Sequence, residues 1–177
     1  MSPDRGRYRF RVLTADDAEQ FRRLRIEALE TSEDVLAATL EEVEAESLES
    51  IRDAIERRTR DGGFSLGAFS SHSDLVGMLN VGRLPLKRRR HIGILWGLFV
   101  SAAHRGQDLA STLLQEAIAR CREIEEISQL HIEVVSSNTR AFDLYRKLGF
   151  EPYGTQPRAV QSSDGFQDYE LLALFLE

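Results

Sequence analysis

Cysteine and long apolar runs are scarce in this chain of 177 residues. Its one cysteine, Cys121, has no partner for an intramolecular disulfide, so a hydrophobic core must hold the fold, as in proteins of a reducing compartment. Cys121 falls in an apolar helical pattern, which favours core packing over a role as nucleophile. No apolar run approaches the ~18 residues of a membrane-spanning helix, and the polar segment 1–7 lacks the apolar stretch of a signal peptide. We therefore expect a cytoplasmic protein without a membrane partner.

Metal-binding and nucleotide-binding patterns are also missing from the sequence. The histidines show no ligand spacing with one another or with Cys121, and no Gly-Lys phosphate loop is present. The 23 Lys and Arg against 29 Asp and Glu give a net charge of −6, which disfavours binding to nucleic acid or anionic membranes. The one basic cluster, at 87–90, indicates a solvated hairpin tip or a contact to a phosphate or acidic partner. We expect no metal and no nucleic-acid partner.

The alternation of apolar residues predicts a single α+β domain over 8–177 behind a flexible segment 1–7. The expected strands cover 8–13, 64–69, 75–81, 93–100, 130–135, 151–154 and 169–176. About four helices are expected, beginning near Thr14, Leu48, Leu109 and Asn138. The acidic stretch 31–46 is weakly patterned and is expected to be a loop. These elements predict a mixed sheet of six or seven strands flanked by helices.

The segment after the expected strand 93–100 has the features of an anion site. Arg105-Gly106-Gln107-Asp108 leads into a helix whose apolar residues recur at helical spacing from Leu109. The first backbone N–H groups of a helix have no partner within it, and its dipole is positive at that end. A pyrophosphate is therefore a suitable ligand, although a glycine in such a turn can also serve conformation alone.

A second segment follows the expected strand 130–135. Asn138 is a helix-capping residue, and an apolar stripe from Ala141 to Leu148 includes Tyr145. Gly149 lies where a left-handed residue would end this short helix. Tyr145 therefore shares a helix face with residues of the core.

These two segments resemble the GNAT superfamily of acyl-CoA-dependent N-acyltransferases. The family's phosphate-loop pattern is Arg or Gln, two residues, Gly, one residue, and Gly or Ala. It is matched in order by Arg105, Gly106, Gln107, Asp108, Leu109 and Ala110, with a departure at Asp108, where the family usually has glycine. The family's later pattern is matched by Asn138, Ala141, Leu144, Tyr145, Lys147, Gly149 and Phe150.

The resemblance implies a GNAT-like fold with splayed central strands and acetyl-CoA as cosubstrate. The acetyl group would pass to a primary amine by direct attack in a ternary complex. The resemblance implies that the pantetheine arm pairs with backbone groups of Leu98, Phe99 and Val100, and that a backbone N–H near Phe99 supports the developing oxyanion. Tyr145 would donate a proton to the leaving sulfur. Family members often dimerise, so a homodimer is a further expectation.

Several of these residues have a second interpretation. Asn138 either caps its helix, binds the pantetheine amides, or does both. Arg105 either contacts a phosphate or makes a surface salt bridge. Asp108 either repels the phosphates or points to solvent in the first helical turn. Glu133, on the strand face opposite its apolar neighbours, is a candidate base, as is His91, and a water chain without a dedicated base is an equal alternative.

The acceptor is the least defined part of the prediction. The family places it between the segments here numbered 31–46 and 153–168, with Trp96 possible on the floor of the site. The acidic residues of 31–46 would attract a cationic amine, or they form a solvated helix face. Small molecules and peptide amines both remain open. The alternative function is a catalytically weak or inactive acyl-CoA-binding and sensing domain.

Overall fold

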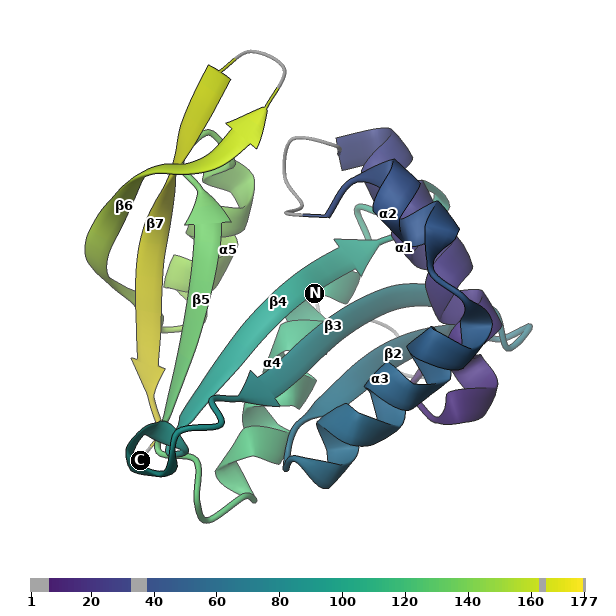
Figure 1. The fold of residues 1–177 in the computed structure, drawn as a ribbon, viewed down its shortest axis with the longest axis horizontal. Coiled ribbons are helices and arrows are strands. Elements are labelled where there is room, and N and C mark those ends of the chain that lie inside the picture. Colours follow the sequence, from purple (N-terminus) through teal and green to yellow (C-terminus); the bar gives the residue numbers. More distant parts are fainter. Residues whose placement is uncertain (1–6, 33–37, 163–164, 177) are drawn as a thin grey trace.

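The computed structural model describes residues 7–32, 38–162 and 165–176. Within them, seven strands form one mixed sheet in the order β1-β2-β3-β4-β5-β7-β6 (Figure 1). The strands are β1 (Tyr8–Val12), β2 (Phe64–Ser70), β3 (Leu75–Arg83), β4 (Ile92–Val100), β5 (Gln129–Val135), β6 (Glu151–Ser162) and β7 (Gly165–Phe175). The α-helices are α1 (Ala18–Ser32), α2 (Leu40–Ala45), α3 (Leu48–Arg60), α4 (Leu109–Arg122) and α5 (Thr139–Lys147). This is the mixed α+β fold that the sequence predicts.

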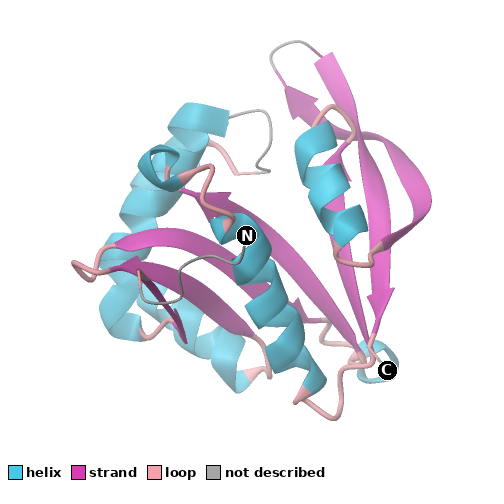
Figure 2. Ribbon diagram, turned by 180° about the vertical axis from the view of Figure 1, so that it is seen from behind, coloured by secondary structure: helices cyan, strands magenta, loops and turns pink. Residues whose placement is uncertain are grey.

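Helices cover both faces of the sheet (Figures 1 and 2). On one face, the apolar sides of α1 and α3 pack on β2 and β3, with Phe21, Ile51 and Phe69 in a buried cluster. On the other face, α4 buries Leu113 and Leu114 in a second, larger cluster. Burial of these apolar stripes is the main force that holds the helices to the sheet.

The central strands β4 and β5 diverge. They form the parallel pair of the sheet, and their pairing runs from Ile92 and Gln129 to Leu95 and Ile132, where it ends. The register between β3 and β4 shifts between Met78 and Asn80, next to Gly97, which has a φ of +68°. A bulge of this kind bends a strand and redirects its edge. The second half of β4 thereby leaves β5, and its edge toward β5 has no strand partner among the described residues, which confirms the predicted splay.

The sequence did not predict the bounds of helix α2. It lies in the acidic stretch expected to be a loop, and it begins with a capping box in which Glu42 N–H donates to Thr39 Oγ1 and Thr39 N–H donates to the Glu42 carboxylate. The Thr-x-x-Glu spacing is a sequence signal for a helix start. The expectation of a loop was therefore wrong here because the apolar pattern is too short to show a six-residue helix.

The closing hairpin of β6 and β7 is longer than predicted. Strand β6 continues past the expected end at 154 to Ser162, and β7 begins at Gly165 rather than at 169. Pro152, Pro157 and Gly154 disfavour a strand by propensity, yet β6 lies at the sheet edge, where a missing N–H removes no ladder bond. The prediction was wrong because edge position depends on the tertiary fold.

The flexible segment 1–7 falls almost entirely outside the described residues. Among the helices of the described residues, none is long and apolar enough to cross a membrane.

Candidate active site

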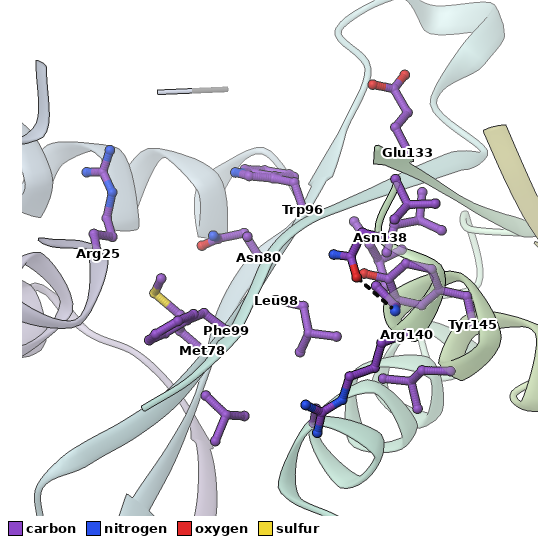
Figure 3. A pocket seen from close by; sticks show the side chains of 18 of the residues that line it. Arg25, Met78, Asn80, Trp96, Leu98, Phe99, Glu133, Asn138, Arg140 and Tyr145 are labelled. Atoms are coloured by element: carbon purple, nitrogen blue, oxygen red, sulfur yellow. Dashed lines mark hydrogen bonds between the residues drawn. The ribbon is translucent and has the colours of Figure 1, made fainter. Parts of the chain in front are cut away.

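A cleft of about 1320 Å³ opens where β4 and β5 diverge (Figure 3). Its walls come from α1, α3, β3, β4, β5 and α5, and from the loop that leads into α4. Both motifs of the sequence line this cleft, with Gly106 and Ala110 at the start of α4 and Asn138 and Tyr145 on or before α5. The divergence of two strands therefore brings together segments that are about 30 residues apart in the chain.

The start of α4 presents backbone N–H groups toward the cleft. Leu109 is the first helical residue, and no described residue accepts a hydrogen bond from the N–H groups of Leu109, Ala110 or Ser111. Gly106 has a φ of +75°, and a Cβ placed there would meet no atom within 4 Å. The loop is thus open on the side where an anion would approach the helix end.

Asp108 is the N-cap of α4 and has a φ of +57°. This left-handed conformation explains why glycine suits the position, since only glycine adopts it without strain, whereas aspartate tolerates it better than most residues. The Asp108 side chain is exposed and accepts no capping hydrogen bond among the described residues. The expected place in the first helical turn was off by one position, and the carboxylate lies at the mouth of the anion site.

The side chains of Arg105 and Gln107 are engaged elsewhere. Arg105 Nε donates to the Val100 carbonyl at 3.1 Å, and its guanidinium lies 5.3 Å from the centre of the Phe99 ring. Gln107 Oε1 accepts from the Tyr8 hydroxyl at 2.9 Å, and Gln107 does not line the cleft. Arg105 lines the cleft but braces the end of β4, so a phosphate contact requires its side chain to reorient.

Asn138 and Tyr145 lie next to each other in the cleft wall (Figure 3). Asn138 caps α5, because its Oδ1 accepts from Ala141 N–H at 3.1 Å. This bond leaves the side-chain amide N–H groups of Asn138 available. Gly149 has a φ of +92° and follows the last turn of α5, as its sequence position predicts.

Tyr145 is 6% exposed and packs with its ring centre 6.1 Å from that of Phe150. Burial raises the pKa of its phenol above the ordinary value of 10.0. No described residue hydrogen-bonds its hydroxyl group. Tyr145 is therefore a protonated donor throughout the neutral range, held rigidly by core packing and facing the cleft.

Glu133 and Trp96 also line the cleft. Glu133 is exposed on β5. The pKa of Tyr169 is raised, first by burial of its own phenol and second by the negative charge of Glu133. Trp96 is 41% exposed and lies on the side of the cleft nearer α3, with Asn80 and Met78 (Figure 3). Among the described acidic residues of 38–46, Glu46 lines the cleft, and Glu33 and Asp34 lie outside the described residues.

Sequence reasoning missed three arginines of the cleft. Arg140, in the first turn of α5, is exposed on the side of the cleft nearer α4 (Figure 3). Arg25 of α1 and Arg58 of α3 line the opposite end. The sequence did give an indication for Arg140, because it lies two residues after Asn138, the cap of α5 in the second motif. Arg25 and Arg58 belong to ordinary amphipathic helices, and only packing against the sheet shows which arginines face inward.

The cleft has the features that acetyl-CoA requires. It offers open N–H groups for the phosphates, an unpaired strand edge for an extended amide chain, and a buried phenol where the strands part. No group of His, Cys, Asp and Glu among the described residues is arranged to hold a metal ion. The residues present therefore fit an acyl-CoA thioester.

Comparison with known proteins agrees with this site. The model of the acetyltransferase (GNAT) family matches residues 21–150, so the chain belongs to this family of enzymes. The L-amino acid N-acetyltransferase AaaT of Escherichia coli K12 is 30% identical over 100 residues, which are 56% of this chain and 61% of that protein. The chain thus matches somewhat less than two thirds of that relative's length.

Solved structures share the whole fold. Ribosomal-protein-alanine N-acetyltransferase from Brucella melitensis superposes with a TM-score of 0.83 at 27% identity, over 95% of this chain and 99% of that one. A phosphinothricin acetyltransferase of the GNAT superfamily from Sinorhizobium meliloti, solved in complex with acetyl-CoA, superposes with a TM-score of 0.83 at 17% identity, over 96% and 88%. Homologues of this fold therefore bind acetyl-CoA.

Proposed function

We propose that this protein transfers the acetyl group of acetyl-CoA to a primary amine by direct attack in a ternary complex. One observation carries the proposal: a single cleft joins the open N-terminus of α4 to Tyr145 through the gap between β4 and β5. The acceptor is a small molecule or a peptide, and both kinds occur among the relatives.

The donor is held by backbone groups first and by side chains second. The open N–H groups at the start of α4, those of Leu109, Ala110 and Ser111, are suited to the diphosphate, with the helix dipole behind them. Arg140 supplies a guanidinium to the same end, and Arg105 can add another on reorientation. At the strand gap, the free edge of β4 from Leu98 to Val100 and the Asn138 amide would pair with the extended arm.

Acetyl-CoA supplies an activated acetyl carbon on a thioester sulfur. The free amine forms a C–N bond to that carbon as the C–S bond breaks, so the sulfur gains a proton and the amine nitrogen loses one. The Tyr145 phenol is positioned to give the sulfur its proton. The proton lost by the amine returns to Tyr145 or to solvent through water. A backbone N–H of β4 near Phe99 stabilises the charge that develops on the acetyl oxygen.

We assign deprotonation of the acceptor's ammonium group to water, with Glu133 as the carboxylate candidate. Glu133 is exposed in the cleft, so it would act through solvent. The single buried cysteine also supports a reducing, cytoplasmic location for the protein.

Replacing Tyr145 with Phe tests the proposal. We expect release of free thiol from acetyl-CoA, in the presence of an accepted amine, to slow by about 100-fold or more, because the leaving sulfur loses its proton donor. The dissociation constant of CoA, measured by calorimetry, should change by less than about threefold. Because burial raises the Tyr145 pKa, the wild-type rate should show no loss from tyrosine ionisation up to about pH 10.

The matched control is Tyr153→Phe. Tyr153 begins the segment expected to border the acceptor, but in the structure it is an exposed tyrosine of β6 that does not line the cleft. Its turnover should stay near that of the wild type. A Tyr145→Phe enzyme with unchanged turnover would remove the proton-donor role. A wild-type protein that binds CoA but acetylates no amine across a broad panel would instead support the sensing domain.

A further inference from the structure

The cleft continues past the strand gap to an end formed by α1, α3, β3 and Trp96 of β4. This acceptor end is apolar along most of its wall, with Phe21 and Met78 among its residues. Two guanidinium groups enter it, from Arg25 of α1 and Arg58 of α3. Figure 3 shows Arg25 on the side of the cleft away from Tyr145. Cations at this end are unexpected for a site that receives an ammonium group.

The two arginines differ in their partners. Arg25 pairs with the Glu46 carboxylate at 2.6 Å, and both side chains are about three-quarters buried. Arg58 Nη1 donates to Ser65 Oγ, and Ser65 Oγ donates in turn to Asn80 Oδ1 at 2.8 Å. The Arg58 guanidinium also lies over the Trp96 ring, 4.9 Å from its centre. Among the described residues, no carboxylate is within salt-bridge distance of Arg58.

The surroundings of Arg58 hold it in place without a direct ion pair, because the nearby Glu46 carboxylate pairs with Arg25 instead. Ser65 and Asn80 are buried and neutral, so they fix its position but do not cancel its charge. Burial, together with the nearby positive charges of Arg25 and Arg57, lowers the pKa of Arg58 to about 10, although the Glu46 carboxylate opposes this shift. Arg58 therefore stays protonated near pH 7. A half-buried cation without an ion-pair partner is unfavourable, and an anionic ligand at this place would relieve the penalty.

We infer that the acceptor is a free amino acid whose carboxylate pairs with Arg58 while its amino group faces the thioester. The inference rests on the proposed acetyl transfer and names the acceptor class for it. A planar guanidinium suits a carboxylate, which it can bind through two parallel hydrogen bonds. Trp96 lies two positions before Leu98 on β4, so the carboxylate site and the proposed thioester site are neighbours along one strand.

A different occupant, the N-terminus of a protein, predicts another behaviour. An N-terminal residue in a peptide has an amide where a free amino acid has its carboxylate, so it offers Arg58 no counter-charge. A purely structural role for Arg58, tying α3 to β2 through Ser65, predicts no dependence on the acceptor's carboxylate. A free amino acid and its amide share the same amino group and side chain. Comparing the two as acceptors therefore distinguishes these cases.

The experiment compares free L-amino acids with the corresponding L-amino acid amides as acceptors of acetyl-CoA. For the best side chain, we expect kcat/KM to be roughly 10- to 100-fold higher for the free acid, the effect of one charge-assisted hydrogen-bonded pair. In Arg58→Gln this preference should fall to within about threefold. Arg58→Lys should keep part of it, because the charge remains but the planar fork is lost.

Controls separate recognition from folding and from turnover. Arg57→Gln changes the exposed neighbour on the same helix and should keep the full preference. CoA affinity of Arg58→Gln, measured by calorimetry, should match the wild type, which shows that the fold and the donor site are intact. A second readout needs no turnover: the CoA-bound wild-type protein should bind N-acetyl-L-amino acids more tightly than their amides, and Arg58→Gln should not.

Each outcome bears on a different claim. Equal use of acids and amides by the wild type, or a preference that survives Arg58→Gln, overturns the carboxylate site and leaves acetyl transfer standing. Absence of transfer to every amine, with N-acetyl-L-amino acids still bound in an Arg58-dependent way, supports the carboxylate site and overturns the proposed activity. A preference for amides over acids favours a protein N-terminus.

Discussion

At the scale of single residues, the clearest departure from the family pattern is Asp108. The residue at this position must adopt a left-handed backbone conformation, and it lies beside the open end of α4. Aspartate adopts this conformation better than most residues, but its negative charge opposes an anion at the helix end. The backbone and charge effects can be separated by mutation.

We predict that Asp108→Asn tightens acetyl-CoA binding by about threefold to tenfold, because it removes one exposed charge near the phosphates and keeps a side chain that tolerates the left-handed backbone. Asp108→Gly should tighten binding by a similar factor and should also relieve the backbone strain. Calorimetry at low and high salt checks this, since the gain should shrink as salt screens the charge. Weaker binding by both variants would contradict a repulsive Asp108.

At the scale of elements, the bulge in β4 decides whether the cleft exists. Gly97 permits the positive φ of the bulge, and the pairing of β4 with β5 stops near it. The side that β4 exposes beyond this point is the edge that we assign to the pantetheine arm. A strand without the bulge would continue along β5 and would close the gap.

We predict that Gly97→Ala lowers both stability and activity. A Cβ at Gly97 would lie 2.9 Å from Asn80 Nδ2, and a left-handed alanine adds roughly 1–2 kcal/mol of strain. Urea unfolding should show a loss of about that size, and kcat/KM should fall further because the free edge of β4 moves. The control is Gly154→Ala in β6, where the nearest atom lies 3.9 Å from the added Cβ and little change is expected. Equal effects of the two substitutions would contradict this role for the bulge.

At the scale of the whole molecule, the sheet has two parts joined by a short seam. Strands β1 to β4 carry α1, α3 and α4, and strands β5 to β7 carry α5, while β4 and β5 pair over a few residues at one end (Figures 1 and 2). A donor that contacts the start of α4, the edge of β4 and the α5 segment would bridge both parts. Its binding energy would then add to the stability of the assembled sheet.

We predict that CoA at 100 times its dissociation constant stabilises the fold by about 2.7 kcal/mol, which raises Tm by roughly 5–10 °C. Hydrogen exchange should slow most in the second half of β4 and at the starts of α4 and α5. ATP at the same concentration serves as control, because it offers phosphates without a pantetheine arm, and it should protect less. Protection confined to the hairpin of β6 and β7 would contradict binding in the cleft.

Most of the fold followed from local patterns in the sequence. The stripe from Leu109 to Cys121 is buried as a helix face, and Gly149 ends α5 in the expected left-handed conformation. The two predictions that were wrong, those for α2 and for the length of β6, have physical causes. Helix α2 is too short for its apolar period to be visible, and the extension of β6 through its prolines is tolerated because that strand lies at the sheet edge.

The sequence by itself determined the half of the cleft that we propose for the donor, because Asn138, Tyr145 and the loop at 105–110 are local motifs whose geometry depends on adjacent helix ends. Only the tertiary structure decided the acceptor half. Arg25 and Arg58 come from different helices with no shared motif, and they meet because α1 and α3 pack on the same face of the sheet. Charges that are distant in the chain become neighbours through burial, and burial is a property of the whole packed molecule.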